Sequence, residues 1–462
     1  MHCETDVLVL GAGLAGLAAA ADLGKHATVL ERGDRPGGLV RTECFDGYWF
    51  DRVIHLLYFS DSNMQQRISA LLGNDLVRCS PVAWVECSAG TVRFPFQIHF
   101  GGLEPTVAAH CLHDFLRSVS APQEQPAPSN FEEMLLRTFG KTMCDVFFFP
   151  YNRKVWKRPL RALAPSGFQW NIVPLSLDQI LHASDEGQES TTSYNCAGWY
   201  PRPPRDALVR GMEVLSRALA REVVDLRLHH SVEAIDLQAR VVTARHKRTL
   251  LRFQFIENCI STIPLPELMM KCLQVPDSLR KACVRLKWNR VLSVALSIRG
   301  PRPMGRGHWR YYADESVIFS RLVYMHEFDP ECAPKDGWSL LAEVVQPAEH
   351  PLDDPQAVMD RVQADIARVG ALPPGCIVLA SHLLLADPAY VVFSVRDADL
   401  VERAKAFLAE FGIICLGRYG RWEYSSMSQV MRDGFNSAKE ARIAISRKLT
   451  RPDMVPPEVE RS

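Results

Sequence analysis

The 462-residue sequence lacks the features that would tie it to a membrane or a secretory route. No apolar run reaches the roughly 18 residues that a membrane-spanning helix needs. The first residues, MHCETD, are polar and acidic, so the basic segment that opens a signal peptide is missing. We therefore expect a cytoplasmic protein that makes no membrane contact.

An excess of one charge and a framework of paired cysteines are also missing. The 53 basic and 53 acidic side chains balance, which argues against nucleic acid as a partner. The 13 cysteines show neither C-x-x-C pairs nor the His/Cys spacing of a metal site. Reduced thiols and no bound metal are the expectation. The length suits two or three domains with a large buried core.

A glycine-rich turn near the start indicates a dinucleotide-binding unit. An apolar strand at 7–10 runs into GAGLAG and then an alanine-rich helix that ends near Leu23. In this pattern Gly11 permits the turn, Gly13 lets the backbone approach a pyrophosphate, and Gly16 lets the helix pack closely on the strand. The N-terminus of the helix attracts the phosphate charge.

The next thirty residues narrow the choice of cofactor. A second strand at 27–30 ends in Glu31, about twenty residues after the first glycine, where a carboxylate can accept a hydrogen bond from an adenosine ribose. Gly37 and Gly38 then form a second glycine pair. The pattern resembles the extended fingerprint of FAD-binding proteins of the two-dinucleotide-fold type. That resemblance implies that Arg41 lies near the flavin. The alternative is that Arg41 is a solvated cation on the surface.

Later segments can complete such a fold. Helical periodicity covers 206–222 and about 428–448, and strand patterns occupy 232–235, 240–244, 259–263 and 413–416. The resemblance places Val232 at the adenine, and Gly417 and Arg418 near the flavin. We expect an α/β fold in which a Rossmann-like FAD-binding domain is interleaved with a mixed α+β substrate domain.

The expected domain limits follow from these patterns. The FAD-binding domain takes 1–75, 206–285 and 406–450, the substrate domain takes 76–205 and 286–405, and 451–462 form a tail. The first substrate segment is mainly helical, with an exposed proline-rich loop at 118–129 and a capping box at 129–132 that restarts a helix. The second contains a strand at 291–298 and a helix near 354–369.

The stretch PYNRKVW, residues 150–156, interrupts an apolar run and carries a family resemblance. Together with GRYGRWEY it makes nearly the whole chain resemble the UDP-galactopyranose mutase branch of the amine oxidase and protoporphyrinogen oxidase-like flavoproteins. In mutases of eukaryotic type this segment lines the sugar-nucleotide side of the active site, which implies that role for Tyr151, Asn152, Lys154 and Trp156. The alternative is a helix terminus packed by its two aromatic residues.

The same resemblance assigns further site residues. It implies that Arg299 and Tyr424 hold a diphosphate, that Tyr311 lies in the active site and that His55 lies beside the flavin. A half-buried packing role for Tyr311 and a structural role for His55 are the alternatives. Asn171 aligns where the mutases carry an arginine, so one substrate-side cation is missing.

Other departures from the family pattern suggest an altered substrate or altered chemistry. Val53–Ile54 and Pro204–Arg205 stand where the family has glycine pairs, and we expect both to crowd or re-route loops near the flavin. An expected tyrosine is Phe328, and another near Arg396 is not evident.

The leading functional expectation is an FAD enzyme that isomerises a nucleotide-linked or otherwise activated sugar. In the resembling mutases the reduced flavin N5 attacks the anomeric carbon and the sugar ring opens and recloses, so reduced FAD is required and NAD(P)H is one candidate reductant. An oxidase or dehydrogenase of the amine oxidase type, acting on a small molecule, is the second hypothesis. A degenerate relative that binds ligand without redox work is the third. The sequence gives no indication of oligomeric state.

Overall fold

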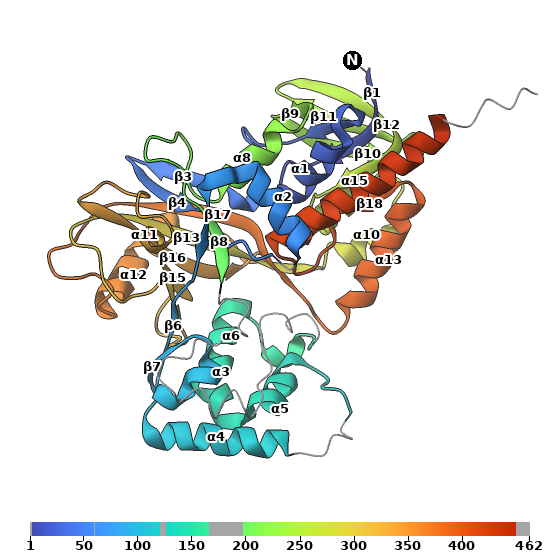
Figure 1. Ribbon diagram of the computed structural model, residues 1–462. Coiled ribbons are helices and arrows are strands. Elements are labelled where there is room, and N and C mark those ends of the chain that lie inside the picture. Colours follow the sequence, from blue (N-terminus) through green and yellow to red (C-terminus); the bar gives the residue numbers. More distant parts are fainter. Residues whose placement is uncertain (1, 60, 121–125, 166–196, 450–462) are drawn as a thin grey trace, which may run out of the picture.

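The computed structural model describes residues 2–59, 61–120, 126–165 and 197–449 (Figure 1). Asn171, one of the expected substrate-side positions, lies outside these ranges. Two large sheets and a helical lobe make up the molecule. Within the described ranges no helix combines the length and the apolar composition needed to cross a bilayer.

The first sheet contains the glycine-rich turn. Its strand order is β10-β11-β12-β1-β2-β9, and β18 pairs in parallel with the end of β12. The strands are β1 (His2–Leu10), β2 (Ala27–Leu30), β9 (Asp225–Arg227), β10 (His230–Asp236), β11 (Val241–His246), β12 (Thr249–Ser261) and β18 (Ile413–Cys415). The pairs β12–β1, β1–β2 and β2–β9 are parallel, whereas β10, β11 and β12 form an antiparallel ribbon.

Side-chain alternation along β1 explains how helices cover both faces of this sheet. Val7 and Val9 point to one face, where α1 (Leu14–Leu23), α8 (Glu213–Arg221) and α15 (Met427–Leu449) pack. Leu8 and Leu10 point to the other, which α9 (Leu265–Lys271), α10 (Asp277–Cys283) and α13 (Asp397–Glu410) cover. All four side chains are fully buried, as expected for a parallel strand covered on both faces.

The second sheet is mostly antiparallel and lies beside the first (Figure 1). Its order is β17 (Ile377–Val392), β13 (Lys287–Arg299), β16 (Gly337–Pro347), β15 (Arg321–Tyr324), β14 (Trp309–Tyr312), β6 (Ala83–Cys87) and β7 (Gly90–Arg93). One face of β13 packs on α12 (Pro355–Arg368) through Leu292, Val294 and Leu296. Val291, on the opposite face, belongs to a small cluster against which Leu39 and Val53 pack.

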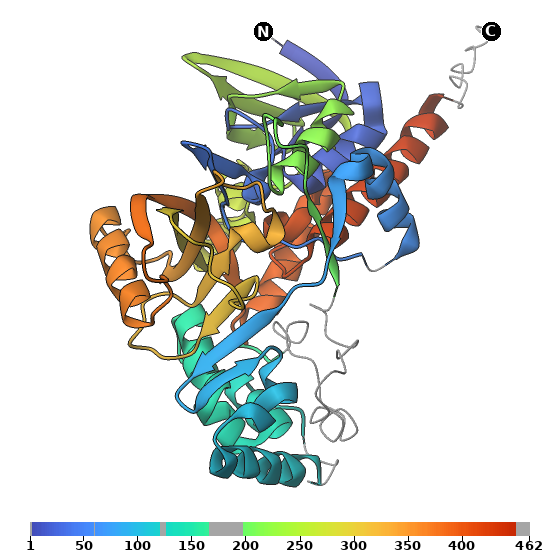
Figure 2. The same ribbon diagram turned by 60° about the vertical axis from the view of Figure 1, so that its left-hand side comes forward.

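The helical lobe lies at the bottom of Figure 1 and consists of α3 (Phe96–His99), α4 (Pro105–Val119), α5 (Phe131–Met143), a π-helical turn at Cys144–Phe148 and α6 (Phe149–Trp156). Figure 2 shows the segment through β6 and β7 descending to this lobe. The apolar run before PYNRKVW forms the lobe's core, because Phe147 and Phe148 stack on Phe96 and Phe139, respectively.

Short elements connect these parts. They are β3 (Thr42–Phe45), β4 (Tyr48–Asp51), α2 (Ser62–Leu72), β5 (Leu76–Cys79), β8 (Gly198–Pro201), α11 (Met325–Phe328) and α14 (Gly417–Gly420). The arrangement confirms the expected fold class, a Rossmann-like sheet interleaved with a mixed α+β region.

Two sequence expectations about helix starts are wrong. The helix expected from residue 206 starts only at Glu213, because Gly211 adopts φ +68° and the buried Arg210 bonds the carbonyl oxygens of the preceding loop and Asp329. Helix α5 is capped by Asn130 rather than Ser129: the Asn130 side chain accepts from the Glu133 amide at 2.9 Å.

Candidate active site

One cavity of about 620 Å³ lies where the two sheets and the helical lobe meet. This volume is within the range of small-molecule sites. The cavity begins at the glycine-rich turn, which we call the dinucleotide groove. It continues past His55 and Arg418 and ends in an aromatic chamber, lined by the rings of Tyr151, Trp156, Tyr311, Tyr390 and Tyr424.

The three glycines of the first turn have separate roles in the dinucleotide groove. The Gly11 amide donates to the Leu30 carbonyl at 2.8 Å, which extends the β1–β2 pairing to the start of the turn, and Gly11 takes φ +102° there. A Cβ on Gly16 would lie 2.1 Å from the Gly11 carbonyl oxygen, so only glycine lets α1 approach β1 this closely. No described atom lies within 4 Å of a Cβ built on Gly13, which lines the cavity.

Glu31 and the second glycine pair form the rest of the groove. The Glu31 carboxylate accepts from the amides of Ala12 at 2.8 Å and Gly33 at 2.7 Å. Gly37 and Gly38 line the same wall, and both have positive φ, at +127° and +59°. Val232, on β10, lines the same cavity. These positions suit the roles that the sequence predicts for them.

Arg41 lines the groove beside the loop that follows Glu31. Its guanidinium pairs with Asp34 at 3.2 Å and bonds the Arg35 carbonyl oxygen. A Cβ on Gly33 would lie 2.3 Å from its Nη2 atom, so the side chain folds back over the loop that follows Glu31. Arg41 therefore lines the groove close to Glu31, and its place near the flavin stays a prediction.

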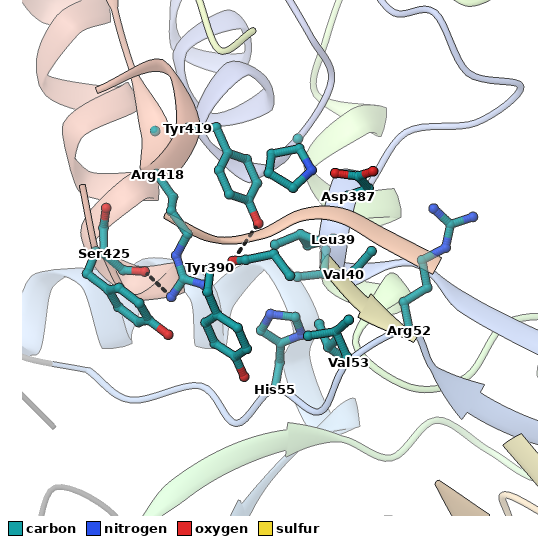
Figure 3. A pocket seen from close by; sticks show the side chains of 18 of the residues that line it. Leu39, Val40, Arg52, Val53, His55, Asp387, Tyr390, Arg418, Tyr419 and Ser425 are labelled. Atoms are coloured by element: carbon teal, nitrogen blue, oxygen red, sulfur yellow. Dashed lines mark hydrogen bonds between the residues drawn. The ribbon is translucent and has the colours of Figure 1, made fainter. Parts of the chain in front are cut away.

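The middle of the cavity brings together His55, Arg418 and Val53 (Figure 3). The Arg418 Nη2 donates to the Ser425 carbonyl at 3.0 Å, and its guanidinium carbon lies 4.3 Å from the Tyr424 ring centre. Burial, followed by the nearby Arg418 charge, lowers the pKa of His55 to about 3. His55 is therefore neutral at physiological pH. Gly417 contributes backbone to the same wall.

The two replaced glycine pairs differ in their consequences. Val53 and Ile54 line the cavity, and Val53 packs with Leu39 against Val291 of the second sheet. Both residues thus lie on the cavity wall, and their crowding of the flavin stays a prediction. Pro204–Arg205 is exposed and is not part of the described lining; the buried Arg210 bonds the Pro204 carbonyl oxygen at 2.9 Å and holds the loop in this position. The expectation that this second pair crowds the site is wrong.

Helix α6 shows how PYNRKVW contributes to the aromatic chamber. Tyr151, Asn152 and Trp156 line it, whereas Lys154 points to the opposite side. The Asn152 side chain donates to the Phe148 carbonyl at 2.7 Å and accepts from the Trp156 indole N–H at 3.1 Å. This bond fixes the indole against the chamber.

Arg299 does not reach the cavity. It is exposed at the end of β13 and is absent from the described lining. Arg321, at the start of β15, lines the chamber instead, and its Nε and Nη2 both donate to the Glu343 carboxylate at 2.8 Å. Hairpin register could have revealed it, because Tyr311 and Arg321 are directly paired across β14 and β15.

Tyr390 is a second residue that the sequence analysis missed. It comes from β17, and its ring stacks parallel to that of Tyr424 with centres 6.1 Å apart. Burial raises the pKa of Tyr390 to about 12 and that of Tyr311 above its usual value, so both phenols stay protonated and can donate. Phe328 stands where the family resemblance implies a tyrosine. It is fully buried and does not line the cavity, so this replacement takes no hydroxyl group away from the chamber.

The comparisons with known proteins agree with this geometry. Residues 14–378 match the family described as flavin containing amine oxidoreductase. The chain belongs to this family. Its fold is similar to that of a reduced UDP-galactopyranose mutase, with 21% identity, coverage of 95% of this chain and 94% of the other, and a TM-score of 0.86.

Two other members of the fold are less similar. A proposed protoporphyrinogen oxidase from Exiguobacterium is 15% identical, with 96% and 99% of the two chains covered and a TM-score of 0.69. A putrescine oxidase bound to putrescine is 17% identical, with 96% and 100% covered and a TM-score of 0.61. Membership of this family implies a flavin cofactor.

The cavity fits a flavin nucleotide. Gly13 leaves room where a pyrophosphate needs close backbone approach, and the Glu31 carboxylate stands at the wall where a ribose would bind. Among the described residues, the buried Nδ1 of His55 and Nε of Arg41 have no hydrogen-bond partner. Unpartnered polar atoms on a cavity wall are consistent with a polar ligand.

Proposed function

We propose that the flavin is FAD and that the protein isomerises a nucleotide-linked or otherwise activated sugar in the manner of a mutase. The observation that carries this proposal is the charge of the aromatic chamber. Arg321 lines it beside one carboxylate, Glu343, and a second guanidinium group, Arg418, lies at its entrance over the Tyr424 ring. Across the cavity in Figure 3, Arg52 and Asp387 balance each other in charge.

A chamber with an excess of positive charge favours an anionic ligand. The planar fork of Arg321 can bond phosphate oxygens while neutralising their charge, and Glu343 holds it in one orientation. The protonated phenols of Tyr311 and Tyr390 supply further donors. A substrate that binds through a lone ammonium group would instead have to approach two cations.

The remaining residues would orient the ligand and exclude water. The rings of Tyr151 and Trp156 offer flat apolar faces on which a base or a sugar can stack. Neutral His55 can donate or accept a hydrogen bond at the boundary between chamber and groove. When bound, the flavin supplies the covalent and electron chemistry, so the chain itself needs to bind, orient and shield the substrate.

The test is turnover without net redox change. Protein loaded with FAD and reduced with dithionite under argon is mixed with a panel of sugar nucleotides, and products are resolved by chromatography. Our proposal predicts an isomeric product with no consumption of reductant beyond the first reduction. Steady consumption of reductant in step with product would contradict it.

An amine oxidase-type reaction is the second candidate. The family description and the fold of the putrescine oxidase favour it, and the Glu343 carboxylate could form an ion pair with a protonated amine. In this case aerobic incubation with a panel of amines and alcohols would form peroxide continuously. A purified protein that stays colourless when FAD is added would exclude both reactions and leave ligand binding without redox work.

A further inference from the structure

Lys154 makes an unusual set of hydrogen bonds behind the aromatic chamber. Its side chain is 5% exposed, and Nζ donates to the backbone carbonyl oxygens of Tyr312 at 2.8 Å, Asp314 at 2.8 Å and Phe319 at 2.7 Å. Burial lowers the pKa of Lys154 to about 7, whereas only the ammonium form has the three N–H groups that these three bonds use. Bonds of this charged kind are stronger than neutral ones.

The three carbonyl groups belong to the hairpin that carries the opposite wall of the chamber. Tyr312 ends β14, Phe319 precedes β15, and the neighbouring residues Tyr311 and Arg321 line the chamber. Lys154 itself belongs to α6, whose residues form the other wall. One ammonium group therefore joins the two walls from behind.

The walls also meet on the cavity side. The rings of Tyr151 and Tyr311 make an edge-to-face contact with centres 5.4 Å apart. This contact is worth on the order of 1 kcal/mol. It is too weak to hold α6 against the hairpin alone, whereas loss of the ammonium would leave three carbonyl groups without their charged donor.

We propose that Lys154 is a positioning residue: it fixes the separation of the α6 wall from the β14–β15 wall and thereby sets the affinity of the chamber for an anionic ligand. The second half of this statement depends on the proposed function. The first half does not, since it concerns the spacing of two walls in the protein itself.

Arg153 provides a matched control on the same helix. Its Nε donates to Glu315 at 2.7 Å, so it also links α6 to the same hairpin. Both side chains are about half exposed, at 51% and 52%. Exposed pairs contribute little because water screens them.

The experiment compares Lys154→Met with Arg153→Met, both loaded with FAD. UDP is the probe of the chamber, and its Kd is measured by calorimetry. We expect Lys154→Met to keep the flavin spectrum and to raise the Kd roughly tenfold or more, since small misplacements of binding groups have large effects. Arg153→Met should change the Kd less than about twofold.

Hydrogen exchange measured by mass spectrometry gives a readout that does not depend on ligand. Lys154→Met should speed exchange in both 149–156 and 309–321, and Arg153→Met in neither. Unchanged exchange, or faster exchange in α6 alone, would overturn the proposal. If Lys154→Met does not fold, Lys154→Gln, which keeps two shorter-reaching donors, should show the same pattern at smaller amplitude, and a wild-type pattern would overturn the proposal.

The two failures are distinguishable. Wild-type protein that does not bind UDP would count against the proposed function, while the exchange data would still decide whether Lys154 holds the walls. Equally tight UDP binding in wild type and Lys154→Met would show that Lys154 does not set the affinity of the chamber. This result would not count against the proposed function.

Discussion

The dinucleotide groove and the aromatic chamber belong to one cavity but are built in opposite ways. The groove comes mostly from residues 11–41, which are close together in the sequence, and its main requirement is space next to backbone. The chamber collects side chains from α6, β14, β15, β16, β17 and the loop after α14. The groove is thus fixed by local geometry, and the chamber by tertiary packing and charge pairing.

This difference predicts where substitutions act. Changes in the groove should affect flavin binding, and those at packed positions should also affect folding. Changes in the chamber should leave the flavin spectrum in place and alter the binding of the second ligand. The following predictions test this separation, from the largest expected effect to the smallest.

Gly16→Ala should have the largest effect. The added methyl group would lie 2.1 Å from the Gly11 carbonyl oxygen, and overpacking against backbone costs about 3 kcal/mol. We expect a lower midpoint in urea unfolding and loss of flavin absorbance. The control is Gly13→Ala, where no described atom lies within 4 Å of the new methyl group. It should keep wild-type stability and lose flavin affinity only. Equal stability of both variants would show that close helix packing is not what Gly16 provides.

Arg321→Met should weaken ligand binding in the chamber without affecting flavin binding in the groove. Removing a charged donor that faces the ligand should weaken UDP binding by about 2 kcal/mol, with the flavin spectrum retained. Calorimetric titration measures this difference. Arg299→Met is the control, because Arg299 is exposed and lies outside the cavity, so UDP affinity should be unchanged. Weaker UDP binding in Arg299→Met with unchanged binding in Arg321→Met would show that Arg299, and not Arg321, binds the phosphate.

The protonation of His55 makes a prediction about acid stability. Its folded pKa of about 3 lies below the unfolded value of about 6.5, so as the pH falls below 6.5 the unfolded state takes up a proton that the folded state does not. Between pH 7.5 and pH 5 this should cost about 2 kcal/mol of the free energy of unfolding. Urea unfolding of wild type and His55→Gln at both pH values measures it. A loss of the same size in the variant would mean that His55 is charged when folded.

Tyr390→Phe should have the smallest effect. It removes one phenol donor and keeps the ring, so UDP binding should weaken by about 1 kcal/mol. Tyr324→Phe is the control, since Tyr324 is fully buried outside the cavity and its hydroxyl group has no hydrogen-bond partner among the described residues. An unchanged Kd for Tyr390→Phe would show that this phenol does not contact the ligand.

The same difference explains what could be predicted from the sequence. The groove was readable because Gly11, Gly16 and Glu31 meet local requirements at fixed spacing. The fold class follows from the glycine-rich fingerprint and the family resemblance. The predicted start of α8 is wrong because a tertiary anchor, Arg210, holds the preceding residues out of the helix.

The chamber was only partly readable. PYNRKVW supplied Tyr151 and Trp156, since both lie on one short helix. The family resemblance points to Arg299, at the end of β13, and only the hairpin register places Arg321 beside Tyr311. Tyr390 comes from the long strand β17, and no local pattern shows which of its residues face the cavity.

A crystal structure of the protein with both FAD and UDP bound tests the central claim most directly. The account predicts that the FAD diphosphate lies at the glycine-rich turn with its adenosine ribose at Glu31, and that the UDP diphosphate lies in the chamber against Arg321. UDP bound in the dinucleotide groove, or a chamber that stays free of UDP at saturating concentration, would contradict it.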